Sequence, residues 1–146
     1  MLSNLRKVFL FSLGMSTAAL GLDISKPVVR CEQGQNMVLV GKKAGNEEQL
    51  YIGLYHWTKI QHPGYGRVSY PEPIVDVSPI TRVDQAITAI SYVSEGKIKL
   101  YVESQYADED IDFEEPLSHE GRVTYMADGR KQTITKMKCK FFEESN

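Results

Sequence analysis

Apolar and polar residues alternate along most of the chain from Asn36 to Glu144, and valine, isoleucine, threonine and tyrosine are frequent there. A period of two with these residue types is typical of strands that bury one face. The clearest runs are 37–43, 49–57 and 97–103, and residues 44–47 form a turn between the first two. In the run 49–57, Leu50, Ile52, Leu54 and His56 share one face, whereas Tyr51, Gly53, Tyr55 and Trp57 share the other.

Prolines interrupt the next run, which consists of residues 67–70 and 74–77 with Pro71 and Pro73 between them. Proline has no N–H and cannot donate to a strand ladder. We therefore expect this segment at a sheet edge or a bulge.

Residues 83–95 fit two patterns. Apolar residues at helical spacing and a glycine stop at Gly96 suggest a helix. The same stretch is rich in β-branched and aromatic residues, and residues 94–97 make a good hairpin loop before the strand 97–103. We expect a hairpin.

The last hairpin has the strongest local signal, because Asp128-Gly129 suits a two-residue type I′ turn between 122–127 and 130–142. This turn pairs Tyr125 with Gln132 and Val123 with Ile134. Apolar residues then fall on both faces of the hairpin. Either both faces are partly covered, or a bulge near Lys136 switches the faces.

The N-terminus has the features of a secretory signal peptide. Arg6 and Lys7 precede an uncharged apolar run, and small residues offer cleavage after Ala19 or Gly21. The run is too short to span a bilayer, and the first cysteine comes too late for a lipoprotein. We expect residues 1–21 to be a signal, residues 22–146 to be a single β domain, and the mature protein to be secreted or periplasmic without a transmembrane segment.

Cys31 and Cys139 are the two cysteines of the chain. Export favours a disulfide between them, which in the chain-entropy model removes about 4–5 kcal/mol of denatured-state freedom. Such a bond requires the two Cα atoms to lie within about 7 Å, so the first and last strands must meet. We therefore predict a small antiparallel β-barrel or sandwich of six to eight strands whose N- and C-terminal strands are joined by the disulfide.

Charge narrows the range of partners. The whole chain has a formal net charge of -2 and a pI of about 5.9. Removal of the signal leaves fifteen basic against nineteen acidic residues, a net charge of -4. Nucleic-acid binding normally needs a strongly basic face, so we expect no nucleic-acid partner.

Aromatic residues are densest between Tyr51 and Tyr70. Residues 62–66 read His-Pro-Gly-Tyr-Gly, which suggests a loop with an exposed ring and a tip for binding. The candidate binding residues are His62, Tyr65, His56, Trp57 and Tyr55. For Tyr51, Tyr55 and Trp57 the alternative is simple packing on one strand face.

Two charged clusters have ordinary explanations. Asp108, Asp110 and Asp112 have the spacing that opens a calcium loop, but the glycine and glutamate that should follow are Phe113 and His119. This stretch is a weak metal candidate and is expected to be a solvated acidic loop. Lys136, Lys138 and Lys140 share a face of the last strand, as in the protection of a sheet edge; attachment to an anionic surface is the alternative.

No catalytic constellation accompanies the three histidines, His56, His62 and His119, and no cofactor motif is present. The sequence predicts an exported, non-catalytic binding or inhibitor-type module that engages an envelope protein or small ligand through the loop near residues 61–66. Small envelope inhibitors of hydrolases are similar in size and class, without a shared motif. The alternatives are a β-barrel that carries a small ligand and an accessory subunit of an envelope assembly.

Overall fold

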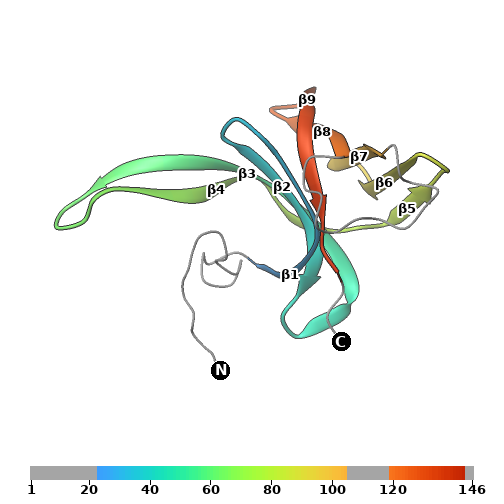
Figure 1. Cartoon of the computed structure of the whole chain (residues 1–146), viewed down its shortest axis with the longest axis horizontal. Helices are drawn as coiled ribbons and strands as arrows, with labels where there is room; N and C mark the ends of the chain where they lie inside the picture. Colours follow the sequence, from blue (N-terminus) through green and yellow to red (C-terminus); the bar gives the residue numbers. More distant parts are fainter. Residues whose placement is uncertain (1–22, 105–118, 144–146) are drawn as a thin grey trace.

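The computed structural model describes residues 23–104 and 119–143, which form nine strands and no helix (Figure 1). The strands, in chain order, are β1 Ile24–Gln33, β2 Asn36–Lys43, β3 Asn46–His62, β4 Gly66–Pro79, β5 Arg82–Gln85, β6 Ala89–Ser94, β7 Ile98–Ser104, β8 His119–Ala127 and β9 Arg130–Phe141. The predicted signal peptide, residues 1–21, lies outside the described residues.

All nine strands belong to one antiparallel sheet in the order β4-β3-β2-β1-β9-β8-β7-β6-β5. Two meanders, β1–β4 and β5–β9, are joined where β1 pairs with β9. The sheet curls into a half-barrel, in which β4 and β5 are the two edges and do not pair with each other. The predicted closed barrel or two-sheet sandwich is therefore replaced by a single curled sheet. The structure has nine strands where six to eight were predicted, because β1 and the short β5 do not show the alternation by which the other strands were recognised.

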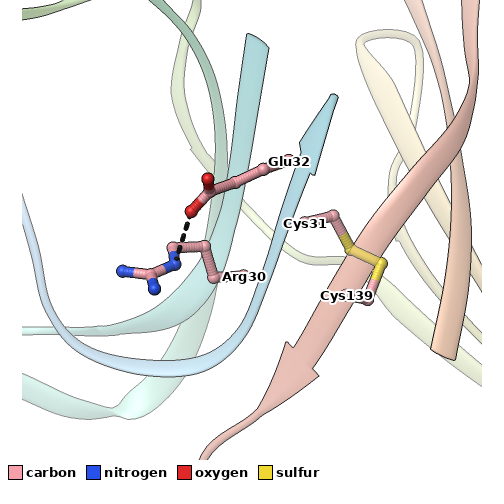
Figure 2. Close-up of a disulfide and its surroundings, with 4 residues drawn as sticks. All are labelled: Arg30, Cys31, Glu32 and Cys139. Carbon is pink, nitrogen blue, oxygen red and sulfur yellow. Dashed lines mark ion pairs between the residues drawn. A yellow bond between two sulfur atoms is a disulfide. The ribbon is translucent and has the colours of Figure 1, made fainter. Parts of the chain in front are cut away.

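The disulfide lies in the seam between the two meanders. Cys31 on β1 and Cys139 on β9 are directly opposite each other, with their Cα atoms 4.0 Å apart and a sequence separation of 108. Figure 2 shows the bond crossing from one strand to the other, while Arg30 and Glu32 point away from it and form an ion pair of 2.9 Å. The predicted disulfide is confirmed.

A glycine on β8 makes room for the sulfur atoms. A Cβ atom on Gly121 would lie 2.4 Å from Sγ of Cys139 and 3.1 Å from Sγ of Cys31. Both distances are too short for ordinary packing, so any larger residue at this position would displace the bridge. The seam therefore depends on three strands, with the disulfide of β1 and β9 resting on the bare backbone of β8.

The concave face holds the main core. It is formed by fully buried side chains from both meanders, among them Val29, Val38, Ile52, Leu54, Leu100, Val102, Val123, Met137 and Cys139. Burial of such aliphatic side chains contributes about 1.5–3 kcal/mol each. The core side chains come from strands on both sides of the seam. They can pack together only because the sheet curls, and their packing in turn stabilises the curl.

A bulge in β9 brings the second half of that strand into the core. The predicted pairs of Tyr125 with Gln132 and Val123 with Ile134 are present, and the register shifts between Gly121 and Val123. Lys136 has a φ of 58°, the left-handed conformation of a bulge residue. Met137 and Cys139 therefore join the face of Val123. The bulge near Lys136, one of the two predicted alternatives, is confirmed.

The chain crosses from one sheet edge to the other in two residues. Ile80 N–H donates to the carbonyl of Leu50 on β3, and Thr81 N–H donates to that of Val93 on β6, both at 2.8 Å. Nearby, the buried Ser94 Oγ donates to Ser78 Oγ at 3.2 Å. These bonds hold the two edges together at one end of the half-barrel.

A smaller cluster covers part of the convex face. Ile24, Met37, Leu39 and Tyr55 are buried there, and Tyr51, Trp57 and Val77 pack against them. The Tyr55 ring folds over Gly53, where a Cβ would lie 2.8 Å from the Tyr55 hydroxyl. That hydroxyl is buried and has no hydrogen-bond partner among the described residues.

Two other local predictions, a hairpin near residue 95 and an edge position for the proline-containing run, are confirmed. The hairpin expected near residue 95 is present as β6 and β7, with Gly96 in the turn at a φ of 80°. The proline-containing run is an edge strand, and β4 pairs irregularly with β3 between Ile52 and Tyr55. Strand β4 is continuous through Pro71 and Pro73. At a sheet edge, positions that face away from the neighbouring strand need no N–H donor, so the two prolines cost no hydrogen bond to β3.

Two buried tyrosines make the free energy of unfolding sensitive to pH in the alkaline range. Burial raises the pKa of Tyr55 to about 12, with a further contribution from the carboxylates of Asp23 and Asp76. Burial likewise raises the pKa of Tyr92 to about 12. An unfolded tyrosine titrates near pH 10. Above that pH the unfolded state loses protons that the folded state keeps, so stability is complete below about pH 10 and is lost as the pH rises towards 12.

We predict that urea unfolding, followed from about pH 9 to about pH 11.5, shows a loss approaching 2–3 kcal/mol for each of these tyrosines. The double variant Tyr55→Phe, Tyr92→Phe should lose less stability over the same interval. Tyr65→Phe, at an exposed position, is the control and should behave as the wild type. An equal loss in all three proteins would contradict the assignment.

Candidate functional site

The β3–β4 hairpin extends beyond the body of the protein. Pairing of β2 with β3 stops at Asn36 and His56, whereas β3 and β4 remain paired as far as His62 and Gly66. We call residues 58–70 the arm. Figure 1 shows it as a long two-stranded ribbon projecting to the left of the half-barrel. Its five residue pairs span about 17 Å at the usual rise of a strand.

The register gives the arm two unlike faces. The pairs Thr58–Tyr70 and Ile60–Val68 continue the concave, core-forming face of the sheet. The pairs Lys59–Ser69 and Gln61–Arg67 continue the convex face. One face of the arm is therefore apolar and the other is polar and basic.

The apolar face is left uncovered by the described residues. Ile60 is 42% exposed and Tyr70 is 37% exposed. Leu54 lies on the same face of β3 and is fully buried in the core. The alternating pattern of a buried strand thus runs on into a region where the structure provides nothing for it to pack against.

The tip of the arm carries the most exposed large apolar side chain of the described residues. Tyr65 is 78% exposed, between Gly64 and Gly66, which have φ values of 93° and 72°. These left-handed glycines close the turn after Pro63 and turn the chain back into β4. The backbone of His62 ends β3 at this tip.

Charge on the arm is opposite in sign to that of the rest of the protein. Residues 58–70 contain Lys59 and Arg67 and no aspartate or glutamate. The nearest carboxylate along the hairpin, Glu72, sits at the base, where it accepts a hydrogen bond of 3.3 Å from Thr58. The whole chain is net acidic, so the arm is a local basic element on an acidic protein.

The other predicted binding residues do not gather at the tip. Tyr55 is only 3% exposed and, with Trp57, belongs to the convex cluster at the base of the arm. His56 lies on the opposite face, with Nδ1 3.2 Å from Oδ1 of Asn36. Packing on a strand face therefore accounts for Tyr51, Tyr55 and Trp57. Asp108, Asp110 and Asp112 lie outside the described residues.

The interpretation of the C-terminal lysines as edge protection is wrong. Strand β9 lies between β1 and β8 in the middle of the sheet, because the disulfide seam places it there. Lys138 is opposite Glu32 on one side and Glu120 on the other. Lys140 and Arg30 both lie over the ring of Phe142, at 5.4 and 5.6 Å from its centroid.

Two surface hollows lie away from the arm. One of about 380 Å³ is bounded by the turn after β6 and the β8–β9 hairpin, with Arg82, Lys97, Lys99 and Lys131 in its lining. Arg82 is already engaged, because it pairs with Asp84 at 2.9 Å and also with Glu95. The carboxylates, Asp84 first, raise the pKa of its guanidinium.

The second hollow, of about 230 Å³, lies beside the start of β1. Its Lys26 and Glu47 form an exposed ion pair of 2.7 Å, and this hydrogen bond lowers the pKa of Glu47. Within residues 23–104 and 119–143, no three histidine, cysteine or acidic side chains converge as a metal site.

Sequence reasoning located the tip but missed the arm. The sequence predicts the first of the two strands only as far as Trp57, and it places residues 67–70 in a segment at a sheet edge or a bulge. A signal was nevertheless present: residues 67–70 stand between the Gly/Pro segment 63–66 and Pro71, so a tight turn at 63–66 can pair them with residues 58–62. Strand β2, with 8 residues, is too short to pair with all 17 residues of β3.

Comparisons with known protein families, curated proteins and solved structures give no match. In the part of the chain that the structure describes, no helix has the length and apolar character needed to cross a membrane.

The arm should contribute almost nothing to the stability of the body. We predict that Ile60→Ala changes the free energy of unfolding by less than about 1 kcal/mol. Leu54→Ala, on the same face of the same strand, should cost about 2–5 kcal/mol because it leaves a cavity in the core. Urea denaturation measures both. A cost for Ile60→Ala equal to that for Leu54→Ala would show that the arm packs on the rest of the chain.

Proposed function

We propose that this protein is an exported, non-catalytic binding module of the inhibitor type, and that the arm is the element that engages its partner. The observation that carries this proposal is a two-stranded ribbon that leaves the sheet with both faces exposed and ends in Tyr65 at 78% exposure. A two-stranded ribbon alone is at best marginally stable in water. Such a ribbon at the end of a packed, disulfide-bonded body adds exposed surface to the protein and little stability.

The composition of the arm supports a role in recognition. Tyrosine offers a large contact area at a low cost in conformational entropy, and tyrosine and arginine are enriched among residues that dominate interfaces. The arm has Tyr65 and Tyr70 together with Arg67. Exposed apolar side chains that gather on one element mark interaction sites more often than single scattered ones do.

The packing of the body supports the same role. Its concave face is filled by fully buried side chains from both meanders, which favours the arm over an internal ligand site as the binding element. The disulfide and the apolar sequence of residues 8–22 favour an extracytoplasmic location, secreted or periplasmic. The proposed partner is accordingly a protein of that compartment.

We predict that the tagged protein, incubated with the native envelope fraction, retains a partner in an arm-dependent way. Tyr65→Ala should reduce the recovery of that partner at least about fivefold, the effect of losing an interface residue worth 1 kcal/mol or more. Ile87→Ala is the matched control, because Ile87 is 71% exposed on the loop between β5 and β6 and should leave recovery unchanged.

A shortened protein completes the test. Thr58 and Tyr70 are directly opposite each other, so residues 59–69 can be replaced by a two-residue Asn-Gly turn that suits an antiparallel pair. This protein should fold with nearly unchanged stability and retain no partner. Equal recovery by the wild type and the shortened protein would refute the role of the arm.

A further inference from the structure

Among the described residues, no strand pairs with the outer backbone edges of the arm on either side. Trp57 N–H donates to the carbonyl of Gln35 at 2.7 Å, which shows that odd-numbered residues of β3 direct their backbone groups away from β4. No register shift occurs between the pair Tyr55–Pro73 and the tip of the hairpin. By strand alternation, Lys59 and Gln61 on β3, and Arg67 and Ser69 on β4, also direct their N–H and carbonyl groups outward.

Prolines close part of the β4 edge and leave the rest open. Pro71 and Pro73 occupy outward-directed positions next to the body, so their missing N–H groups cost the sheet nothing and remove two donors from its edge. Arg67 and Ser69 occupy the next two such positions and retain their N–H groups. The sequence thus protects the edge beside the body and exposes it along the arm.

From these edges and faces we infer that an extended segment of a protein partner, with alternating acidic and apolar side chains, adds to the arm as a further strand along β4. This inference rests on the proposed binding function and specifies how the arm engages its partner. In such a pairing the backbone bonds supply the affinity, and alternate side chains supply the specificity.

The side chains beside that edge define the alternation. A strand paired to β4 would place every second side chain on the face of Arg67 and Ser69, with Lys59 across the ribbon. Acidic residues complement this face, because the arm has no carboxylate of its own. The intervening side chains would lie beside Val68 and Tyr70 on the apolar face, where the described residues leave Tyr70 37% exposed.

Two other occupants fit these observations less well. A lipid bilayer could accept Tyr65 and Ile60, but insertion of the ribbon would bury backbone groups of Lys59, Gln61, Arg67 and Ser69 in hydrocarbon, where water is absent and each unpaired group is costly. A second copy of the chain could pair its β4 with this one. It would bring like-charged arms together, with Arg67 near Arg67 of the other copy.

The test uses capped eight-residue peptides as probes, one alternating glutamate and valine and the other lysine and valine. In an NMR titration of the whole protein up to about 1 mM peptide, the Glu-Val peptide should shift the amides of residues 67–70 saturably. It should bind at least about tenfold more tightly than the Lys-Val peptide. Equal affinities, or no shifts in residues 67–70, would overturn the inference.

Two variants separate strand addition from general attraction. Ser69→Pro removes one outward N–H, as Pro71 and Pro73 do, and should weaken binding of the Glu-Val peptide about fivefold to tenfold. Ser69→Ala keeps the N–H and should bind as the wild type does. Arg67→Glu, which alters no backbone group, should reverse the preference between the two peptides. Binding that is insensitive to both Ser69→Pro and Arg67→Glu would refute strand addition.

The remaining outcomes identify the rejected occupants. Arm-dependent dimerisation in sedimentation, or arm-dependent binding to phosphatidylglycerol vesicles, in place of peptide binding would overturn the inference in favour of a second copy or a membrane. The proposed function has its own separate readout. If Tyr65→Ala abolishes retention of the envelope partner while neither peptide binds, strand addition fails and the binding arm stands.

Discussion

The pairing of β1 with β9 is the interaction on which the rest of the structure depends. Without it, β1–β4 and β5–β9 would be two separate meanders, each with an apolar face that has nothing to cover it. The seam brings Val29 and Cys31 beside Cys139 and Phe141, and the disulfide fixes the register at its centre. The sheet then curls, and side chains from both meanders enclose one core. Gly121 belongs to the same constraint, because only a residue without a side chain leaves space for the sulfur atoms.

The seam also separates the stable body from the arm. The body is held by a core whose members are almost fully excluded from water and by a covalent bond between strands distant in sequence. The arm takes no part in either, although it is made of the same two strands that carry Ile52, Leu54 and Val75 into the core. A surface built in this way can change its side chains with little consequence for folding. The body, in turn, ends at Trp57 and Pro71 and so fixes where the arm begins.

Local features of this fold could be predicted from the sequence. Asp128-Gly129 dictates a tight turn, and the register from Ala127 and Arg130 to Val123 and Ile134 follows from it. Two cysteines, together with the expected export of the chain, predict one bond, and hence the contact of the first and last strands. Apolar residues on both faces of the last hairpin correctly indicated a bulge near Lys136 as one alternative.

The larger arrangement depends on contacts that alternation does not encode. Strand β1 includes Pro27, Arg30 and Glu32 and lacks a clear period of two, so its pairing with β9 decides its structure. The same pairing makes β9 a central strand, which overturned the role assigned to Lys136, Lys138 and Lys140. Alternation also shows that Ile60 and Leu54 share a face, but not that only one of them is covered. For this reason the sequence predicts the exposed tip of the arm, whereas the length of the arm and its two faces follow only from the strand register of the structure.

Native-state hydrogen exchange tests most directly the claim that a seam-closed body carries an arm independent of it. The account predicts that backbone amides of β1 and β9 at the seam exchange only through global unfolding, and that the amides of Ile60 and Val68 exchange through local opening at a much lower free energy. Reduction of the disulfide should lower the protection of the seam and leave that of the arm nearly unchanged. Arm amides that exchange as slowly as those of the seam would contradict the account.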